Sequence, residues 1–236
     1  MTELIAVLAA IGALGMTLLP AMMRRGEMVR RVTCRDHLRR LGVATHLYAA
    51  QNHGWLIPHL RNYPDWYIGS FSSLMFVQLT NLVGEVAIDC PNLYPYTIPG
   101  QVDEPGGRHQ RSWGVIVGYN YLGGIPAANM PAPSGWYSPL RDAEDPLMLL
   151  YTDSNNSGWD TQVGRYAAMA PHGARGLVRI LGSSYIHIDW PLTPRDIGAE
   201  GGNVCTLGGA VEWKPIARMR SDYWCAQGDG GWRATW

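Results

Sequence analysis

The stretch Met1–Met23 reads M-T-E-L-I-A-V-L-A-A-I-G-A-L-G-M-T-L-L-P-A-M-M, and it decides the fold. From Leu4 to Met23 it carries no charged residue, so it is about long enough to cross a bilayer as a helix. One carboxylate, Glu3, precedes the apolar run, and Arg24 and Arg25 follow it directly. An acidic residue such as Glu3 at the outer end of an apolar helix is unusual for a membrane anchor. It is consistent with a helix that later leaves the membrane and packs against copies of itself.

A secretory signal peptide is the alternative interpretation of this stretch. Such a peptide begins with basic residues, continues with a short apolar run and ends at a small-residue cleavage site. Here the acid comes first, the bases come last and the apolar run is long, so this alternative is disfavoured. The positive-inside rule would hold the basic residues after the run inside the cell. Four cysteines and a loop-rich remainder favour an exported domain instead.

The residues after the apolar run predict that the helix continues to Gly54, a good helix terminator. Side chains at spacings of four, three, four and three share one helix face: Cys34, Leu38, Leu41, Thr45 and Tyr48. The opposite face carries Arg35, Arg39 and Gln51. Between the apolar and the amphipathic half lie Pro20 and Gly26, and Pro20 predicts a kink or a locally melted segment.

This N-terminal pattern resembles the type IV pilin and type II secretion pseudopilin family with its prepilin-type N-terminus. Residues 3–12, E-L-I-A-V-L-A-A-I-G, match the family's Glu and apolar run, and Pro20 stands 17 residues beyond Glu3, as the family's proline does. Matches continue downstream at Cys34, Leu38, Leu41, Gly42, Tyr48, Ala49, Asn52, Gly54, Pro58, Asp89, Cys90 and Pro91. Residues 201–213, G-G-N-V-C-T-L-G-G-A-V-E-W, resemble a late hairpin of the family.

Two positions depart from the family pattern. The family's Glu normally stands two residues further from the mature N-terminus than Glu3 stands from Met1. The usual Asp-Gly turn of the late hairpin is Gly208-Gly209 here, which also accepts a positive φ.

The resemblance implies a structural subunit that polymerises through its N-terminal helix into an extracellular, type IV pilus-like filament. The alternative is a periplasmic pseudopilin of a type II secretion system. The implied partners are further copies of the chain, the inner membrane before assembly, and the pilus or secretion assembly machinery; the assembled filament would stand at the cell surface. The expected assembly residues are Met1, Glu3, Leu4, Ile5, Val7, Leu8, Ile11, Leu14, Leu18, Leu19 and Pro20.

Glu3 is expected to pair with the amine of Met1 on the same or a neighbouring chain, because a carboxylate in an apolar bundle is costly unless paired. Replacing Glu3 with Gln is therefore expected to lower filament assembly. The alternative is an exposed Glu3 that interacts with the dipole at the start of the helix.

The remaining chain predicts an α+β protein, with the long helix kinked near Pro20 and packed on a mostly antiparallel β-sheet head with long loops. The expected division is residues 1–25 as a transmembrane or filament-core half-helix, 26–54 as an amphipathic half-helix and 55–236 as the head. Expected elements are a short helix over 71–83 and strands or hairpins over 115–122, 147–151, 177–189 and 203–213.

Composition and motifs argue against catalysis and nucleic-acid binding. The 236-residue chain has a net charge of zero, which suggests no nucleic-acid partner. It lacks a P-loop, G-x-S-x-G, G-x-G-x-x-G and H-E-x-x-H, so we expect no enzyme. His187 and Asp189 share one face of a predicted strand and form a weak metal signal.

One segment resembles the first half of a calcium loop, although no cofactor is required by this interpretation. Asp153, Asn155 and Ser157 place oxygen ligands at alternate positions, with Gly158 sixth and Asp160 as a substitute for the missing Glu. Ca²⁺ is therefore one hypothesis, and an ordinary Asn/Ser/Gly turn is the other.

The four cysteines allow three disulfide pairings. Cys34 faces the head, and Cys205 and Cys225 both lie late in the chain, so we expect Cys34–Cys90 and Cys205–Cys225. Reduced, buried cysteines are the alternative.

Overall fold

The computed structural model describes residues 2–59, 68–93, 110–111, 114–127, 130, 135–160, 165–181, 192–221, 223–224 and 232–236. Before residue 22, the exposure of the N-terminal helix is described only for Leu4, Leu8 and Gly12, which are all exposed. The helices are α1 (Thr2–Gln51) and α2 (Ser73–Val83), with 3-10 turns η1 (Glu85–Ile88) and η3 (Ile216–Arg218).

The described strands form three antiparallel sheets. The first has the order β1-β3-β2, the second β10-β9-β5-β4 and the third β11-β12-β6-β7-β8. Their bounds are β1 Ser70–Phe71, β2 Gln110–Arg111, β3 Gly114–Ile116, β4 Tyr119–Tyr121, β5 Leu149–Asp153, β6 Asn156–Asp160, β7 Arg165–Gly173, β8 Gly176–Leu181, β9 Gly201–Thr206, β10 Val211–Pro215, β11 Tyr223–Trp224 and β12 Arg233–Ala234. The expected α+β class with a long N-terminal helix on an antiparallel head is confirmed at this level.

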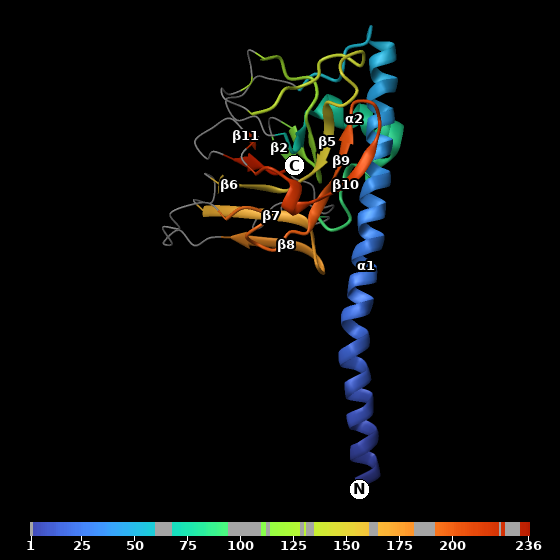
Figure 1. Ribbon diagram of the computed structural model, residues 1–236. Helices are drawn as coiled ribbons and strands as arrows, with labels where there is room; N and C mark the ends of the chain where they lie inside the picture. The colour runs from blue at the N-terminus through green and yellow to red at the C-terminus, as the bar shows by residue number, and fades with distance from the viewer. Residues whose placement is uncertain are drawn as a thin grey trace.

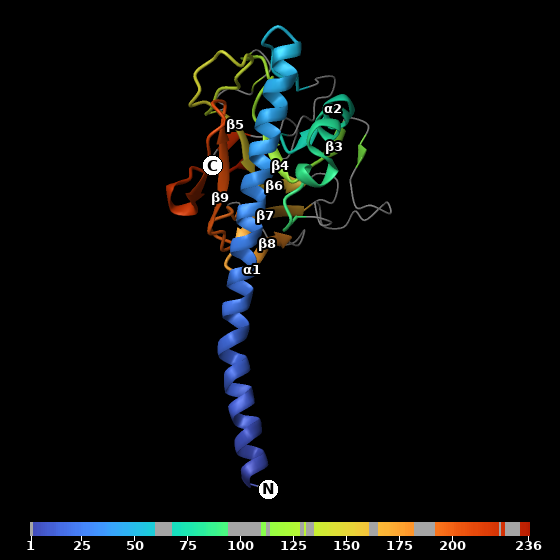
Figure 2. The same cartoon turned by 90° about the vertical axis from the view of Figure 1, so that its right-hand side faces the viewer.

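The helix α1 divides into a part packed on the head and a part that projects away from it (Figures 1 and 2). The packed part lies across β9, β10 and the α2–η1 corner and ends at the top of the head. The N-terminal part continues well below the lowest strand of the head, β8, in both views. The molecule therefore has the outline of a head on a long stalk.

The expected kink at Pro20 is wrong for this structure. The helix α1 is continuous from Thr2 to Gln51 and passes through both Pro20 and Gly26. A proline removes one intrahelical hydrogen bond and costs about 3 kcal/mol relative to alanine. The helical turns on either side keep their own bonds, so the helix is maintained through that position.

Several local expectations are confirmed. The helix α2 begins after Ser72, whose hydroxyl oxygen accepts a hydrogen bond from the Met75 backbone N–H, and it ends at Gly84. The late hairpin is β9–β10, with Val211 opposite Cys205 and Gly209 at a φ of 83° in the turn. The strand β8 pairs with the preceding β7. The second strand expected at 185–189, with His187 and Asp189, lies outside the described residues.

The core forms where α1 meets the second sheet. The face predicted to be buried is confirmed, because Cys34, Leu38, Leu41 and Thr45 have no exposed surface and Tyr48 packs against the same cluster. A Cβ on Gly42 would lie 3.3 Å from Cys205 Sγ of β9, so the absence of a side chain at residue 42 allows the helix to approach the sheet closely. Tyr119, Tyr121 and Tyr151 complete the core as fully buried rings.

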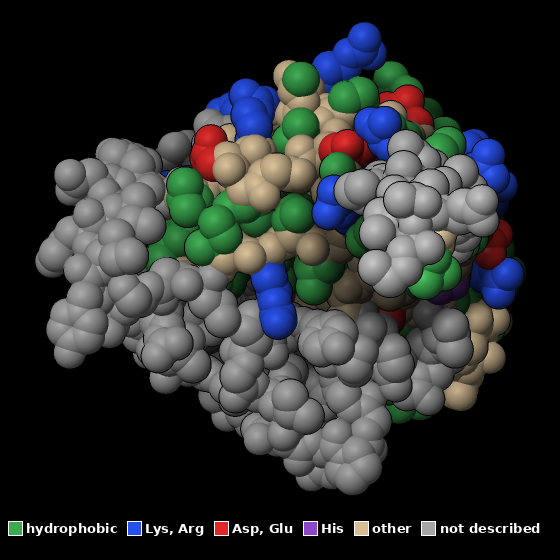
Figure 3. Space-filling view, turned by 90° about the horizontal axis from the view of Figure 1, so that it is seen from below, with side chains coloured by type: hydrophobic (Ala, Val, Ile, Leu, Met, Phe, Trp, Pro, Cys, Tyr) green, Lys and Arg blue, Asp and Glu red, His purple; other side chains and the backbone are tan. Residues whose placement is uncertain are grey.

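Over the part of the chain that the structure describes, none of the helices combines the length and the apolar character that a membrane span requires. The face seen from below the head carries apolar side chains interspersed with separate basic and acidic ones (Figure 3).

Candidate functional site

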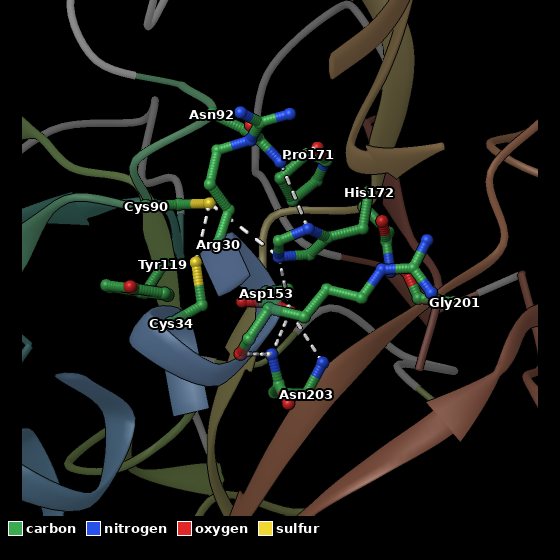
Figure 4. Close-up of polar contacts among 12 residues, drawn as sticks. Arg30, Cys34, Cys90, Asn92, Tyr119, Asp153, Pro171, His172, Gly201 and Asn203 are labelled. Atoms are coloured by element: carbon green, nitrogen blue, oxygen red, sulfur yellow. Dashed lines mark hydrogen bonds and ion pairs between the residues drawn. The ribbon is translucent and has the colours of Figure 1, made fainter. Parts of the chain in front are cut away.

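Buried charged side chains meet where α1 leaves the head. Glu27, on α1, is 1% exposed and lies seven residues before Cys34, so it belongs to the same buried helix face. His172, near the end of β7, and Asp153, at the end of β5, have no exposed surface. These three residues are the centre of what we call the junction site, of which Figure 4 labels Asp153 and His172.

His172 lies between two carboxylates. Its Nδ1 is 2.7 Å from Glu27 Oε1, and its Nε2 is 3.4 Å from Asp153 Oδ2 and 3.7 Å from Cys90 Sγ. Burial alone would lower its pKa, but the Asp153 charge and the bonds to Asp153, Cys90 and Glu27 raise the pKa of His172 to about 12. A carboxylate oxygen faces each ring nitrogen, which favours the protonated ring.

Glu27 is held by four partners. Besides His172, its carboxylate accepts from Asn92 Nδ2 at 2.8 Å, from Arg31 Nε at 3.0 Å and from Arg30 Nε at 3.3 Å. Burial opposes ionisation, but the hydrogen bonds from His172 and Asn92 outweigh it and lower the pKa of Glu27. A buried carboxylate with this many donors stays charged.

The other carboxylate is fixed by β9. Asp153 Oδ2 accepts from the Asn203 backbone N–H at 2.5 Å and from Asn203 Nδ2 at 3.0 Å. Asn203 Nδ2 also donates to the Arg31 backbone carbonyl at 3.3 Å, which ties α1 to the same residue. Trp213 of β10 closes the site, with the Arg31 guanidinium 4.3 Å from its ring centroid and the His172 ring edge-on at 5.6 Å.

These contacts fix both the position of α1 along its axis and its rotation about that axis, relative to the head. Breaking a buried ion pair leaves an uncompensated charge, which costs about 3–5 kcal/mol. A shift of α1 by one turn would break the Glu27–His172 pair and the Arg31–Glu200 bridge between Nη2 and Oε2 together. The junction site therefore acts as an anchor that holds the projecting half of α1 in one direction.

The expected pair Cys34 and Cys90 is brought together at the edge of this site. The two sulfurs are 2.8 Å apart, both side chains are fully buried, and both are free thiols in the structure. Burial, and then the contact with Cys90, raises the pKa of Cys34. Burial also raises that of Cys90, but the hydrogen bonds from Cys34 and His172 outweigh it and lower the Cys90 pKa.

The close contact at Cys90 depends on a glycine in the neighbouring strand segment. A Cβ on Gly118 would lie 2.3 Å from the Cys90 backbone nitrogen, and the Gly118 N–H donates to Asp89 Oδ1 at 3.2 Å. Any side chain at position 118 would therefore push the Cys90 segment away from the junction site.

The second expected cysteine pair is not tested. Cys205 is buried, its Sγ contacts the Thr206 carbonyl at 3.5 Å, and burial raises its thiol pKa to about 12. Its expected partner, Cys225, lies outside the described residues.

The segment considered for calcium occupies two strands rather than an open loop. Asp153 ends β5, Ser157 and Asp160 belong to β6, and Asn155 lies between them. Asp153 is engaged by His172 and Asn203, and Asn155 Nδ2 donates toward the Gly201 carbonyl at 3.4 Å. Asp153 Oδ1 and Asn155 Oδ1 are buried and have no hydrogen-bond partner among the described residues, while the side chain of Asp160 is not described, so the calcium hypothesis stays a prediction. Cys34, Cys90 and His172 are the group within the described residues whose ligand atoms all lie within 4.8 Å of one another.

The expected assembly residues lie on the projecting half of α1. Leu4 is 65% and Leu8 59% exposed. Met1 lies outside the described residues, and the side chains of Glu3, Ile5, Val7, Ile11, Leu14, Leu18, Leu19 and Pro20 are likewise not described. The Glu3–Met1 pairing therefore stays a prediction.

Comparison of the chain with models of known protein families, with curated proteins and with solved structures finds no match in any of the three. Function is therefore argued from the residues and the geometry.

Proposed function

We propose that the protein is a structural subunit that assembles through the N-terminal half of α1 into a helical filament, with the heads on the outside. The observation that carries this proposal is the geometry of α1. One continuous helix is anchored to the head from Glu27 onward, while its apolar first half projects beyond the head. About 25 projecting residues correspond to about 37 Å of helix.

The projecting half needs a partner for physical reasons. Residues 4–23 contain no charged side chain, and Leu4 and Leu8 are largely exposed. A helix that is apolar all round is stable when it is buried, either in lipid or among other helices. Burying one large aliphatic side chain stabilises by about 1.5–3 kcal/mol, so a bundle of such helices gains substantially from each added copy.

The outer side of α1, from Met22 into the packed half, carries exposed apolar side chains interspersed with charged ones such as the Asp36–Arg40 ion pair. Met22, Val29, Val32, Val43 and Leu47 are 49–69% exposed. They fall on one side of α1 at helical spacing, away from the face that contacts the head. A neighbouring helix would cover this face as well, which supports a bundle of parallel helices inside a shell of heads. Before assembly, the inner membrane would hold the apolar half.

A pair of matched substitutions tests this function. Leu8→Glu introduces a charge in the projecting half, whereas Leu147→Glu introduces the same charge on the head, where residue 147 is 78% exposed. Purified full-length protein, freed of detergent, is examined by negative-stain electron microscopy. We expect fibres from the unchanged chain and from Leu147→Glu, and none from Leu8→Glu, with equal circular dichroism of all three. Fibres from Leu8→Glu in normal yield would contradict the proposal. Fibre length distinguishes a long pilus from a short secretion pseudopilus.

A further inference from the structure

The two thiols beside His172 belong to elements far apart in the chain. Cys34 lies on α1, and Cys90 follows η1, 56 residues later. The sulfur atoms are 2.8 Å apart and lie next to the His172 ring (Figure 4). Two non-bonded sulfur atoms, each with its own thiol, do not pack this closely in a relaxed core, whereas a disulfide needs only a small further approach.

A metal site is the competing use of the same side chains. Cys34, Cys90 and His172 offer soft ligands within 4.8 Å of one another. On a tetrahedral zinc with Zn–S bonds of about 2.3 Å, however, the two sulfurs would lie about 3.8 Å apart. His172 also faces a carboxylate from each nitrogen, Glu27 at 2.7 Å and Asp153 at 3.4 Å, so both nitrogens act as donors rather than as ligands. The geometry favours a covalent sulfur pair.

We propose that Cys34 and Cys90 form a disulfide that links α1 covalently to the head beside the junction site. The cross-link joins the helix to the segment held by Gly118 and by Asn92, whose amide donates to Glu27 at 2.8 Å. The cross-link therefore lies next to the junction-site contacts that set the direction of the projecting half of α1.

Closure proceeds by thiol–disulfide exchange, which requires both thiols to be accessible to the exchange partner. The exchange begins with the thiolate of Cys90, before the contacts of the folded junction site have formed. That thiolate attacks a disulfide of an oxidised thiol–disulfide exchange partner and releases one partner thiolate. Cys34 then loses its proton and attacks Cys90 Sγ, which expels the second partner thiolate. The two cysteines lose two protons and two electrons, and the partner disulfide is reduced to two thiols.

The burial of both sulfurs places this reaction before α1 packs on the head. Cys34 and Cys90 have no exposed surface, so neither an oxidant nor a reductant reaches them in the folded protein. Once formed, the bond is therefore protected, and it should be reduced at an appreciable rate only after unfolding.

A peptide map of the full-length protein tests the proposal. The chain is unfolded, refolded in a buffer of oxidised and reduced glutathione, blocked with N-ethylmaleimide under denaturing conditions and digested with trypsin. We expect peptide 32–35, which contains Cys34, to be joined to peptide 62–108, which contains Cys90, with both unlabelled until a reductant is added. In the folded protein, reduction of this link should be at least tenfold slower than in urea.

Two variants serve as controls. Cys205→Ser removes another fully buried thiol and should leave the 32–35 to 62–108 link intact, whereas Cys90→Ser should abolish it. If Cys90→Ser does not fold, the peptide map of the unchanged chain still tests the proposal, because it shows directly whether the two peptides are joined. The proposal is overturned if Cys34 and Cys90 are both labelled without reductant. It is equally overturned if the refolded chain retains one zinc ion per molecule by elemental analysis with both sulfurs free.

Discussion

The two halves of α1 form one continuous helix but are stabilised in opposite ways. From Glu27 onward the helix is held by buried hydrogen bonds, ion pairs and a packed face that ends in Tyr48. Before Glu27 it is uncharged from residue 4 to residue 23 and projects beyond the head in both views (Figures 1 and 2). One half therefore carries its partners within the molecule, whereas we propose that the other takes its partners from further copies of the chain. On this proposal, one helix is both a fold element and an interface.

Mutations in the two halves of α1 should therefore have different effects. Changes around the junction site should alter the stability of the head and the direction of the stalk. Changes in the projecting half should leave the head folded and affect only association.

The largest effect on the head is expected from Glu27→Ala. This change removes the carboxylate partner of His172, Arg31 and Asn92 and leaves the buried imidazolium with Asp153 alone. We expect a loss of about 3–5 kcal/mol in the free energy of unfolding, measured by urea denaturation in mild detergent. Glu212→Ala, at an exposed position of β10, is the matched control and should change stability by less than about 0.5 kcal/mol. Equal effects of the two variants would show that the junction site does not anchor α1.

The next effect is expected from the Cys34–Cys90 link. Closing the loop between these residues restricts the unfolded chain, and such cross-links typically stabilise by about 2–4 kcal/mol. We expect the unfolding midpoint of the oxidised chain in urea to exceed that of the reduced chain accordingly. In a Cys205→Ser chain, where no Cys205–Cys225 link can form, the oxidised-to-reduced difference should still be about 2–4 kcal/mol. An identical midpoint with and without the link would refute a stabilising cross-link.

A smaller effect is expected from Gly118→Ala. The new methyl group would meet the Cys90 backbone nitrogen at 2.3 Å, so the backbone itself must move. We expect a loss of about 1–3 kcal/mol, as for other overpacked cores, together with slower closure of the Cys34–Cys90 link. Gly12→Ala, on the projecting half where no atom lies within 4 Å, is the control and should leave head stability unchanged. A neutral Gly118→Ala would mean that this segment is free to shift.

The pH dependence of stability should reflect His172. Because its pKa rises from 6.5 to about 12 on folding, its stabilising contribution is complete below pH 6.5 and is lost progressively as the pH rises toward 12. The free energy of unfolding should therefore fall by up to about 1.4 kcal/mol per pH unit between pH 7 and pH 9. Glu27, whose pKa is lowered, contributes in the opposite sense and loses its effect in acid. His172→Gln should remove most of the alkaline slope; an unchanged slope would assign it to another group.

Much of the packed half of α1 could be predicted from the sequence, because a helix face is a local property. The spacing from Cys34 to Tyr48 identified the buried side, and Arg35, Arg39 and Gln51 are exposed as expected. The hairpin β9–β10 followed from two apolar runs around Gly208-Gly209. Each of these signals spans fewer than twenty residues.

The junction site was not predicted, because it joins residues far apart in the chain. His172 lies 145 residues after Glu27 in the sequence, and no local sequence pattern predicts that the two side chains meet. One signal was present, since Glu27 falls on the apolar face seven residues before Cys34, where a charge requires a buried partner. The kink at Pro20 was predicted from residue type alone, and the continuity of the neighbouring turns outweighed it.

Removal of the projecting half tests the central comparison most directly. Because Glu27 belongs to the head, the cut is placed before it, at Arg24, so that the junction site is retained. Chains 24–236 and 1–236 are compared by negative-stain microscopy and by sedimentation after detergent removal. We predict single particles with the circular dichroism of a folded head from chain 24–236, and fibres from chain 1–236. Identical fibres from both chains, or single particles from both, would contradict the claim that the first half of α1 is the assembly element.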